Sequence, residues 1–235
     1  MDKNMNIKSC LEMFSSDENR FKTFSKQIEI FFKENKALNI NPLPAVHSLK
    51  SRVKDISHLE EKLNRKWDSG DKITKENFYE RINDLAGVRV LHLYQDQFLT
   101  IHKEIMDNIH VYKEWVLFET PKAYIWDKEK EQLYKDQGID VETKESNYTS
   151  IHYVIKPNSE SFISCEIQVR TLFEEIWGEI DHTINYPTLT QSIACREQLK
   201  VLAKFINAGT RLSDSIFASH NEFKENSKIK KDQNL

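Results

Sequence analysis

Glycine is scarce in this sequence: only 5 glycines occur in 235 residues, and none lies in a glycine-rich phosphate-binding motif. Neither GxGxxG nor GxxxxGK followed by Ser or Thr is present, which excludes a Rossmann turn and a Walker P-loop as the means of binding a nucleotide. If the protein binds phosphate groups, side chains therefore have to hold them.

Cysteine and long apolar segments are also lacking. Cys10, Cys165 and Cys195 are odd in number, far apart and without a CxxC pair, which predicts reduced thiols rather than a disulfide framework or a structural zinc site. No apolar run approaches the roughly 20 residues that span a bilayer. The N-terminal MDKNMNIKSC lacks the apolar stretch of a signal peptide. We therefore expect a cytoplasmic protein that does not insert into a membrane.

Charged residues, by contrast, are abundant and nearly balanced, because 34 Lys and Arg against 37 Asp and Glu give a net charge of −3. Affinity for phosphates must then come from a local cluster of cations, and the segment Lys50 to Lys66 is such a cluster. With 39% hydrophobic residues the chain can bury one substantial core. We predict a single domain over residues 1–222 with flanking helices at both ends, followed by a disordered charged tail over residues 223–235.

Apolar spacing in the N-terminal part is helical. Between Ile7 and Leu38 it is irregular, which indicates two helices or one broken helix, ended by the NPLPAV segment at residues 41–46. The next predicted helix has one buried stripe, with Ser57 placed to cap it and Glu60 at the capping-box position. That stripe consists of Ile56, Leu59, Leu63 and Trp67.

The remaining sequence alternates between strands and helices. Residues 87–94 and 111–119 are predicted to be strands on either side of a helix that begins near Phe98, and residues 148–156 and 162–170 to be two further strands. The polar stretch 120–145 is interpreted as a loop or partly helical insertion over the sheet. A helix over residues 172–185 is expected to stop at Pro187 before a long final helix. This order predicts an α/β (α+β) fold with a mixed β-sheet flanked by helices.

Side chains of a strand alternate between its two faces, so the strings YTSIHYVI and SCEIQVRT each present an apolar and a polar face. The polar faces carry Tyr148, Ser150 and His152 on one strand and Glu166, Gln168 and Arg170 on the other. An aromatic ring, a histidine, a carboxylate and an arginine on one sheet face suit a nucleotide platform. The alternative is an ordinary solvated sheet face.

Two carboxylates add to this pattern. Asp84 lies just before a predicted strand, near Gly87 and Arg89, where it could hold Mg²⁺ against a triphosphate. Glu166, on another strand, would complete a pair in which one carboxylate anchors the ion and the other shares it or accepts a proton from a hydroxyl. Spacing alone does not single these two out, because 37 acidic residues produce many such pairs.

Longer strings make the pattern specific. SRVKDISHLEEKLNRK, DLAGVRV, KESNYTSIHYVI and CEIQVRTLFEEIWGEIDH occur in this order over roughly residues 50 to 186. Together they resemble the synthetase domain of the RelA/SpoT family. This resemblance implies a nucleotidyltransferase-like fold, Mg²⁺ as cofactor, and transfer of pyrophosphate from ATP to the 3′-hydroxyl of GTP or GDP to make (p)ppGpp.

The resemblance also assigns roles on the ATP side. Arg52 and Arg89 correspond to the pair that sandwiches adenine, and a guanidinium plane is suited to stacking on a base. Lys54 and Lys62 correspond to the cations that grip the ATP phosphates. The two carboxylates described above correspond to the metal ligand and to the residue that binds metal or activates the 3′-hydroxyl.

On the acceptor side, Tyr148 corresponds to the aromatic residue that stacks on the acceptor base. The positions around the acceptor phosphates and ribose correspond to Lys144, His152, Gln168 and Arg170. On the following helix Glu175, Glu179 and His182 share a face by spacing, and we expect Glu179 and His182 to support the site and Trp177 to pack in the core.

Two departures from the family pattern concern the acceptor side. The family's FKDYI-like string is absent, and its lysine would come from either Lys122 or Lys135. The small NG pair expected before the tyrosine is replaced by Ser146 and Asn147.

Several alternatives follow. The same fold could pyrophosphorylate the 3′-end of tRNA, as toxin-like members do, or an adenosine nucleotide; a basic patch near Tyr148 would favour tRNA. A non-enzymatic nucleotide sensor would not need both Asp84 and Glu166. No hydrolase activity is expected, because the chain has no His-Asp dipeptide. The sequence leaves open a homo-oligomer and control by an antitoxin or other regulator.

Overall fold

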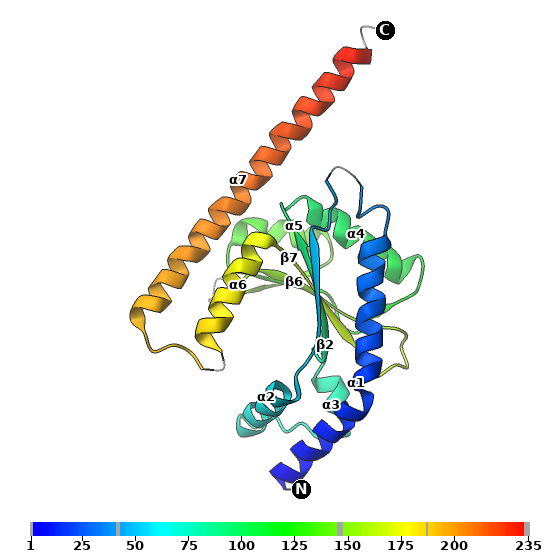
Figure 1. Ribbon diagram of the computed structural model, residues 1–235, viewed down its shortest axis with the longest axis vertical. Helices are drawn as coiled ribbons and strands as arrows, with labels where there is room; N and C mark the ends of the chain where they lie inside the picture. The colour runs from blue at the N-terminus through cyan, green and yellow to red at the C-terminus, as the bar shows by residue number, and fades with distance from the viewer. Residues whose placement is uncertain (1, 41–42, 145–147, 187, 233–235) are drawn as a thin grey trace.

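A mixed β-sheet forms the centre of the molecule. The computed structural model describes residues 2–40, 43–144, 148–186 and 188–232. The sheet has seven strands in the order β1-β2-β7-β6-β4-β5, with β3 beside β6. Helix α1 lies along one side of it, and α6 and α7 lie on the other (Figure 1). The predicted fold class, a mixed sheet flanked by helices, is confirmed.

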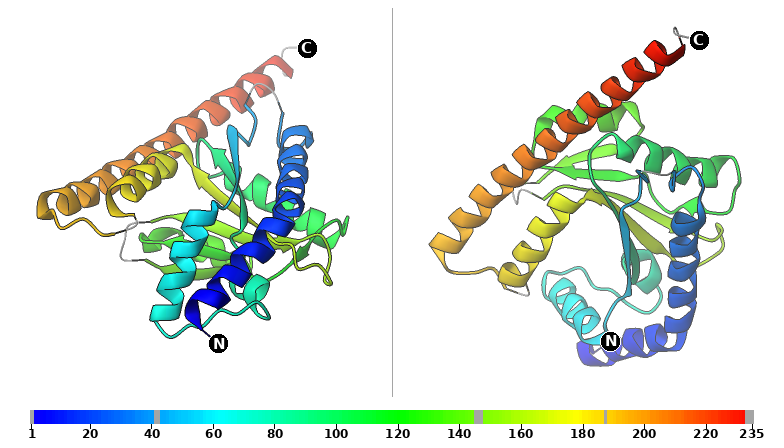
Figure 2. Two further views of the ribbon diagram at one scale, coloured as in Figure 1. Left: turned by 60° about the horizontal axis from the view of Figure 1, so that its bottom comes forward. Right: turned by 45° about the horizontal axis from the view of Figure 1, so that its top comes forward.

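The N-terminal segment forms one long helix, α1 (Lys3–Glu34), which contacts β1 and β2. The helix axis bends along its length, although the helix is continuous (Figure 2). Phe14, Phe21 and Ile28 are fully buried on the side that faces the sheet and neighbouring helices. The irregular apolar spacing therefore reflects one bent helix rather than two. Residues 41 and 42 of the predicted stop lie outside the described residues.

Helix α2 (Ile56–Asp68) follows strand β1 (Ser48–Val53). The prediction that Ser57 caps this helix is wrong: Asp55 is the N-cap, and its side chain accepts a hydrogen bond from the Ser57 backbone at 2.8 Å. A carboxylate at the N-terminus satisfies the free backbone donor there. Leu59 and Leu63 of the predicted stripe are buried, whereas Ile56 is exposed.

A short helix, α3 (Phe78–Arg81), precedes β2 (Ala86–His92), and α4 (Gln97–His110) follows it. The strand predicted over residues 111–119 is reduced to β3 (Val116–Leu117). Val111 instead forms the C-cap of α4. Lys113 then adopts a φ of 57°, in the left-handed region, which interrupts an extended chain.

The stretch 120–145 is part of the sheet, which corrects its interpretation as an insertion over the sheet. It contains β4 (Lys122–Ile125), the 3₁₀ helix η1 (Lys128–Lys130), α5 (Glu131–Asp136) and β5 (Asp140–Thr143). Strand β4 pairs antiparallel with β6, and β5 pairs parallel with β4. Buried Ala123, Ile125, Tyr134 and Ile139 alternate with the charged residues, and these few apolar side chains suffice to anchor the segment.

The two strands on which the predicted platform depends are β6 (Ser150–Lys156) and β7 (Cys165–Thr171). Their predicted apolar face is confirmed, because the alternate residues are buried. These are Ile151, Tyr153, Ile155, Cys165, Ile167 and Val169.

Two C-terminal helices complete the fold. Helix α6 (Leu172–Asn185) matches its predicted range, and Trp177 packs in the core as predicted. Residue 187 lies outside the described residues. Helix α7 (Ile193–Asp232) runs alongside α6 and then extends away from the sheet (Figure 1). It continues past Glu222, so residues 223–232 are helical where the charged composition predicts disorder. No helix within the described ranges is long and apolar enough to cross a membrane.

A capping box fixes the start of α6. The Thr171 hydroxyl accepts from the Glu174 backbone at 3.2 Å, and the Glu174 carboxylate accepts from the Thr171 backbone at 2.7 Å. We expect Thr171→Ala to lower the free energy of unfolding by about 1 kcal/mol, because it leaves a helix-end donor without its partner. Urea denaturation measures this change. Thr171→Ser, which keeps the hydroxyl, should lose much less, and an equal loss in both variants would contradict the capping explanation.

Candidate functional site

A row of polar side chains crosses the sheet on one face. Residues directly opposite each other on paired strands point to the same face. The register of β1, β2, β7, β6, β4 and β5 places six polar residues side by side: Lys50, Arg89, Gln168, His152, Lys122 and Asp140. A neighbouring row brings Arg52, Gly87 and Glu166 together. The predicted platform is thus a continuous face of the sheet.

A cleft of about 290 Å³ lies over the β1, β2 and β7 part of this face. Six of the residues predicted from the sequence line it: Arg52, Asp84, Arg89, Glu166, Gln168 and Glu179. Both predicted carboxylates therefore face the same cavity. Different parts of the chain supply them, since Asp84 precedes β2 and Glu166 lies on β7.

Asp84 is held by two lysines. Lys54 Nζ donates to one of its carboxylate oxygens at 2.7 Å, and Lys62 Nζ, from α2, donates to the other at 2.8 Å. Burial alone would raise the pKa of Asp84, but the charges and hydrogen bonds of the two lysines outweigh it and lower the pKa to about 2. Lys54 is itself largely buried, and burial lowers its pKa although Asp84 opposes this effect. The three groups are therefore electrostatically interdependent.

Glu166 is held by two neighbours on the same face. A hydrogen bond of 2.7 Å joins His152 Nδ1 to Glu166 Oε1, and Gln168 Nε2 donates to Glu166 Oε2 at 2.6 Å. Burial and the negative charge of Asp84 would raise the pKa of Glu166, but the interaction with His152 outweighs them and lowers it. Glu166 is thus ionised, and it senses the charge of Asp84 across the cleft.

An aromatic cluster lies on the β6 and β4 side of the platform. A hydrogen bond of 3.2 Å joins the Tyr148 hydroxyl to His152 Nε2, and the Arg170 guanidinium lies 5.9 Å from the centre of the Tyr148 ring. Tyr124, on β4, packs edge-on against His152 with ring centres 4.8 Å apart. Lys144 Nζ lies 4.5 Å from the Tyr124 ring centre. The predicted acceptor-side residues Lys144, Tyr148, His152 and Arg170 therefore belong to one cluster together with Tyr124, in which Arg170 contacts Tyr148 and Lys144 contacts Tyr124.

Tyr124 was not predicted as a site residue. The alternation in KAYI could have indicated it, because it puts Tyr124 on the same strand face as Lys122. The register pairs Lys122 with His152, so Lys122 lies on the platform. Lys135 lies on α5 and forms an ion pair with Glu131 of the same helix. The structure therefore places Lys122, and not Lys135, beside the other candidate residues.

The first turns of α6 contribute Glu175 and Glu179, both of which accept hydrogen bonds from Arg89. His182, predicted to support the site from the same helix face, instead stacks on Tyr186 with ring centres 4.5 Å apart. Lys50, the first residue of the predicted basic cluster, donates to Glu175 at 2.8 Å, although the sequence analysis assigned it no individual role. Ser146 and Asn147 lie outside the described residues.

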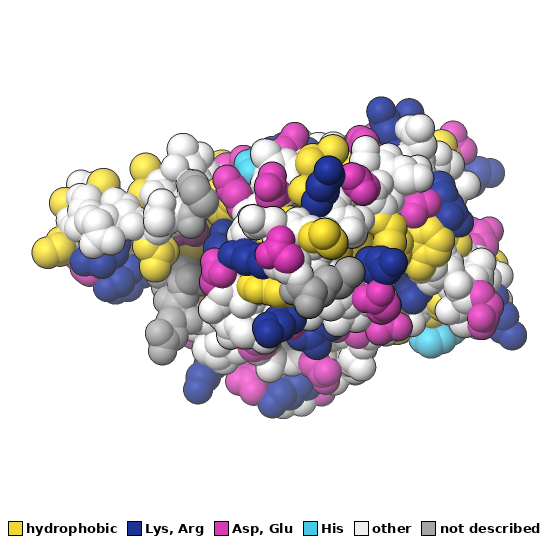
Figure 3. Space-filling model, turned by 90° about the horizontal axis from the view of Figure 1, so that it is seen from below, with side chains coloured by type: hydrophobic (Ala, Val, Ile, Leu, Met, Phe, Trp, Pro, Cys, Tyr) yellow, Lys and Arg dark blue, Asp and Glu magenta, His cyan; other side chains and the backbone are white. Residues whose placement is uncertain are grey.

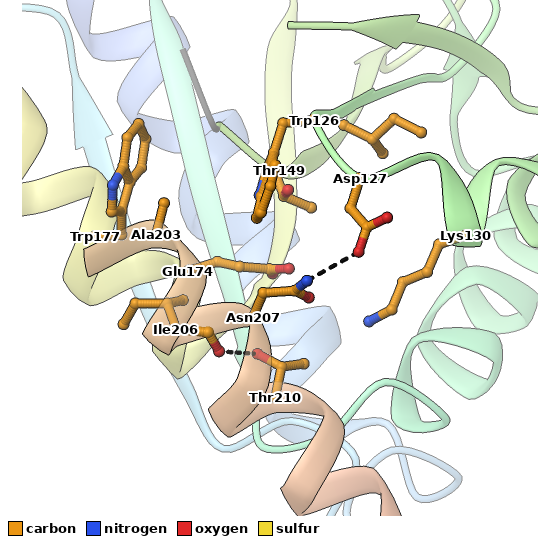
Figure 4. Close-up of a pocket in the computed structure, with 11 residues that line it drawn as sticks. Trp126, Asp127, Lys130, Thr149, Glu174, Trp177, Ala203, Ile206, Asn207 and Thr210 are labelled. Carbon is orange, nitrogen blue, oxygen red and sulfur yellow. Dashed lines mark hydrogen bonds between the residues drawn. The ribbon is translucent and has the colours of Figure 1, made fainter. Parts of the chain in front are cut away.

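A second, smaller pocket of about 30 Å³ lies where α6 and α7 pack against the segment after β4. Figure 4 shows Trp126, Lys130, Glu174 and Asn207 around it, and Asn207 donates to Asp127 at 2.9 Å. None of the candidate residues predicted from the sequence lines this pocket.

Known proteins resemble the chain in sequence and in structure. It is 28% identical over 148 residues to the GTP pyrophosphokinase YwaC of Bacillus subtilis, covering 61% of this chain and 59% of that protein. The chain thus spans about three fifths of the length of this curated relative.

Solved structures share the fold. The crystal structure of the small alarmone synthetase 1 from Bacillus subtilis superposes with a TM-score of 0.67 at 18% identity, covering 90% of this chain and 99% of that one. The same synthetase bound to its product pppGpp gives a TM-score of 0.60 at 19% identity, covering 91% and 97%.

The sequence match is broad enough to assign the family. Residues 51–191, more than half of the 235 residues, match the model of the region found in RelA / SpoT proteins. This range contains the two carboxylates, the aromatic cluster and every residue that lines the cleft except Lys50. The chain therefore belongs to the RelA/SpoT family.

Proposed function

We propose that this protein transfers pyrophosphate from ATP to the 3′-hydroxyl of GTP or GDP and so makes (p)ppGpp. The observation that carries the proposal is the placement of two ionised carboxylates, Asp84 and Glu166, in one cleft lined by Arg52 and Arg89. The name of the relative and the product-bound structure point to the same reaction. A nucleotide sensor would not need two such carboxylates.

ATP would occupy the β1 and β2 side of the cleft. Arg52 and Arg89 lie on neighbouring strands and line it, so that a base can stack on a guanidinium plane. Lys54 and Lys62 converge on Asp84 and are close enough together to contact one chain of phosphates. Polyphosphates are bound here by side chains, in agreement with the lack of a glycine-rich loop.

Mg²⁺ suits the two carboxylates. Protein sites for this ion commonly supply one or two carboxylates and leave the other positions to substrate phosphates and water. Within the described ranges no group of three or more His, Cys, Asp or Glu residues could hold a metal without a substrate. Asp84 and Glu166 would hold the ion, which neutralises phosphate charge when bound.

The reaction is an in-line displacement. The acceptor 3′-oxygen forms a bond to the β-phosphorus of ATP, the bond from that phosphorus to the α,β-bridging oxygen breaks, and AMP leaves with that oxygen. Glu166 is ionised and can accept the hydroxyl proton, while His152 and Gln168 fix its orientation. Catalysis then depends mainly on positioning and on charge neutralisation.

The acceptor would occupy the aromatic side. Tyr148 presents a ring for the acceptor base, His152 lies between it and Glu166, and Gln168 donates to Glu166. Lys144, Arg170 and Lys122 supply positive charge around it.

The charge around Tyr148 does not favour tRNA as acceptor. Lys122 pairs with Glu119 at 3.1 Å, Lys144 with Glu142, and Arg170 with Glu175 at 3.0 Å. Among the described residues around Tyr148, these pairs leave no basic patch of the kind that nucleic acids require. The face of the molecule in Figure 3 mixes Lys and Arg with Asp and Glu outside the residues drawn in grey. A cytoplasmic location, a homo-oligomer and a regulatory partner stay predictions.

One experiment tests the function. The purified protein is incubated with Mg²⁺, γ-labelled ATP and either guanosine nucleotides, adenosine nucleotides or tRNA. We expect label to pass to GTP or GDP with release of AMP. Labelling of tRNA or of an adenosine nucleotide alone would reject the guanosine acceptor, and no labelling with any acceptor would reject the enzyme.

Asp84→Asn tests the metal and phosphate side. We expect it to abolish turnover while the protein stays folded. Since the pKa of Asp84 drops from 3.8 to about 2 on folding, the variant should also lose about 2 kcal/mol of unfolding free energy at neutral pH. A lowered pKa stabilises the fold above the unfolded-state value, so this difference should shrink as pH falls from 3.8 towards 2. Urea denaturation at several pH values measures it, and full activity of the folded variant at saturating Mg²⁺ would refute the assignment.

Tyr148 tests the acceptor side. Tyr148→Ala should weaken the acceptor interaction by about 1–3 kcal/mol, because it removes a stacking ring. ATP affinity should hardly change. Tyr148→Phe should be milder, since it keeps the ring and loses only the hydroxyl, which is hydrogen-bonded to His152. Steady-state kinetics with each substrate varied separates these effects, and an equal loss of ATP affinity would place Tyr148 on the donor side.

A further inference from the structure

Glu175 is a buried carboxylate on which cations from three strands converge. It lies in the first turns of α6, and its side chain is 6% exposed. Lys50 from β1 donates to its Oε1 at 2.8 Å, and Arg89 from β2 donates to the same oxygen at 3.1 Å. Arg170 Nε, from β7, lies 3.0 Å from Oε2 as a close ion pair. A single side chain therefore contacts every strand that lines the cleft.

The two arginines belong to different halves of the site. Arg89 lines the cleft on the proposed ATP side. Arg170 lies over the Tyr148 ring and donates to Gln168 at 3.2 Å, on the proposed acceptor side. A guanidinium group carries its N–H donors around its edge, so a carboxylate that holds the edge leaves the flat faces free for a ring or a base. Glu175 holds both arginines in this way.

The burial of Arg170 depends on a small residue of α6. Arg170 is 3% exposed and passes close to Gly178. A Cβ atom added at Gly178 would lie 2.8 Å from Arg170 Nη1, which is closer than carbon and nitrogen atoms pack. Since Nη1 is the far end of a flexible side chain, a methyl group there would push the guanidinium away rather than disrupt the backbone.

The cations around Glu175 stabilise its charged form. Burial would raise the pKa of Glu175, but the hydrogen bond from Lys50 and the charges of Arg170 and Arg89 lower it overall. Removal of one partner from a buried ion cluster leaves the other charges buried without a counter-charge, which lowers the free energy of unfolding. Glu179, one turn further along α6, differs: its side chain is 52% exposed and its ion pair is with Arg89.

From this geometry we propose that Glu175 is a positioning residue for the pyrophosphate transfer, which sets the orientation of Arg89 for ATP and of Arg170 for the acceptor at the same time. The inference rests on the proposed function. It assigns Glu175 no contact with substrate. Its effect passes through the two arginines, so the two substrate sites share one buried determinant.

Kinetics of matched variants tests this proposal. Glu175→Gln keeps the shape and removes the charge, and we expect it to raise the KM of both ATP and the acceptor about tenfold or more, the scale of one charged hydrogen bond. Glu179→Gln, the control, should raise the KM of ATP alone. Gly178→Ala should raise the KM of the acceptor alone, because it displaces Arg170 and leaves Glu175 in place.

The proposal is overturned if Glu175→Gln lowers kcat or thermal stability with both KM values unchanged, or if its effect is confined to ATP as in Glu179→Gln. If Glu175→Gln does not fold, Gly178→Ala decides: an unchanged acceptor KM in that variant rejects the link between α6 and Arg170. If the wild-type protein labels no acceptor, the proposed function fails first. Calorimetry of a non-hydrolysable ATP analogue and of GDP with the same variants then decides the positioning role on its own.

Discussion

The register between β2 and β7 is the constraint on which the site depends. These parallel strands set Gly87 beside Glu166 and Arg89 beside Gln168. A slip of one residue would turn every one of these side chains to the opposite face, because side chains alternate with a period of two. Burial of Val88, Val90, Ile167 and Val169 on the other face opposes such a slip. The apolar core thus fixes the positions of the polar residues that do not contact it.

Much of this could be predicted from local patterns. Alternation in SCEIQVRT and YTSIHYVI gave the correct buried and polar faces, and helical spacing gave the range of α6. Local patterns do not show which strands are neighbours in the sheet. In the sheet, β7 lies between β2 and β6. In the chain, β7 follows both of them, and β3, β4 and β5 separate β2 from β6. The neighbours of Lys122 and Tyr124 are set by that order, so only the structure could separate Lys122 from Lys135.

The ion pairs of the site were harder to predict from the sequence than the order of the strands. Spacing put Glu175, Glu179 and His182 on one helix face, yet Glu175 is buried against three strands, Glu179 is half-exposed and His182 turns to Tyr186. These differences arise from how α6 packs against the sheet, and spacing along one helix does not show this. Family resemblance supplied candidate roles for single residues, whereas the partners of each charge come from tertiary packing.

The pairing of Lys54 and Lys62 with Asp84 has a consequence for the choice of ligand. Both lysines already hold a carboxylate, so an incoming anion gains only the difference between its own attraction and that of Asp84. A singly charged anion offers little more than the carboxylate it would replace. A polyphosphate offers several charges along one chain and can reach both lysines at once. In the proposed function, this pairing would therefore favour a ligand of high charge density over a singly charged anion.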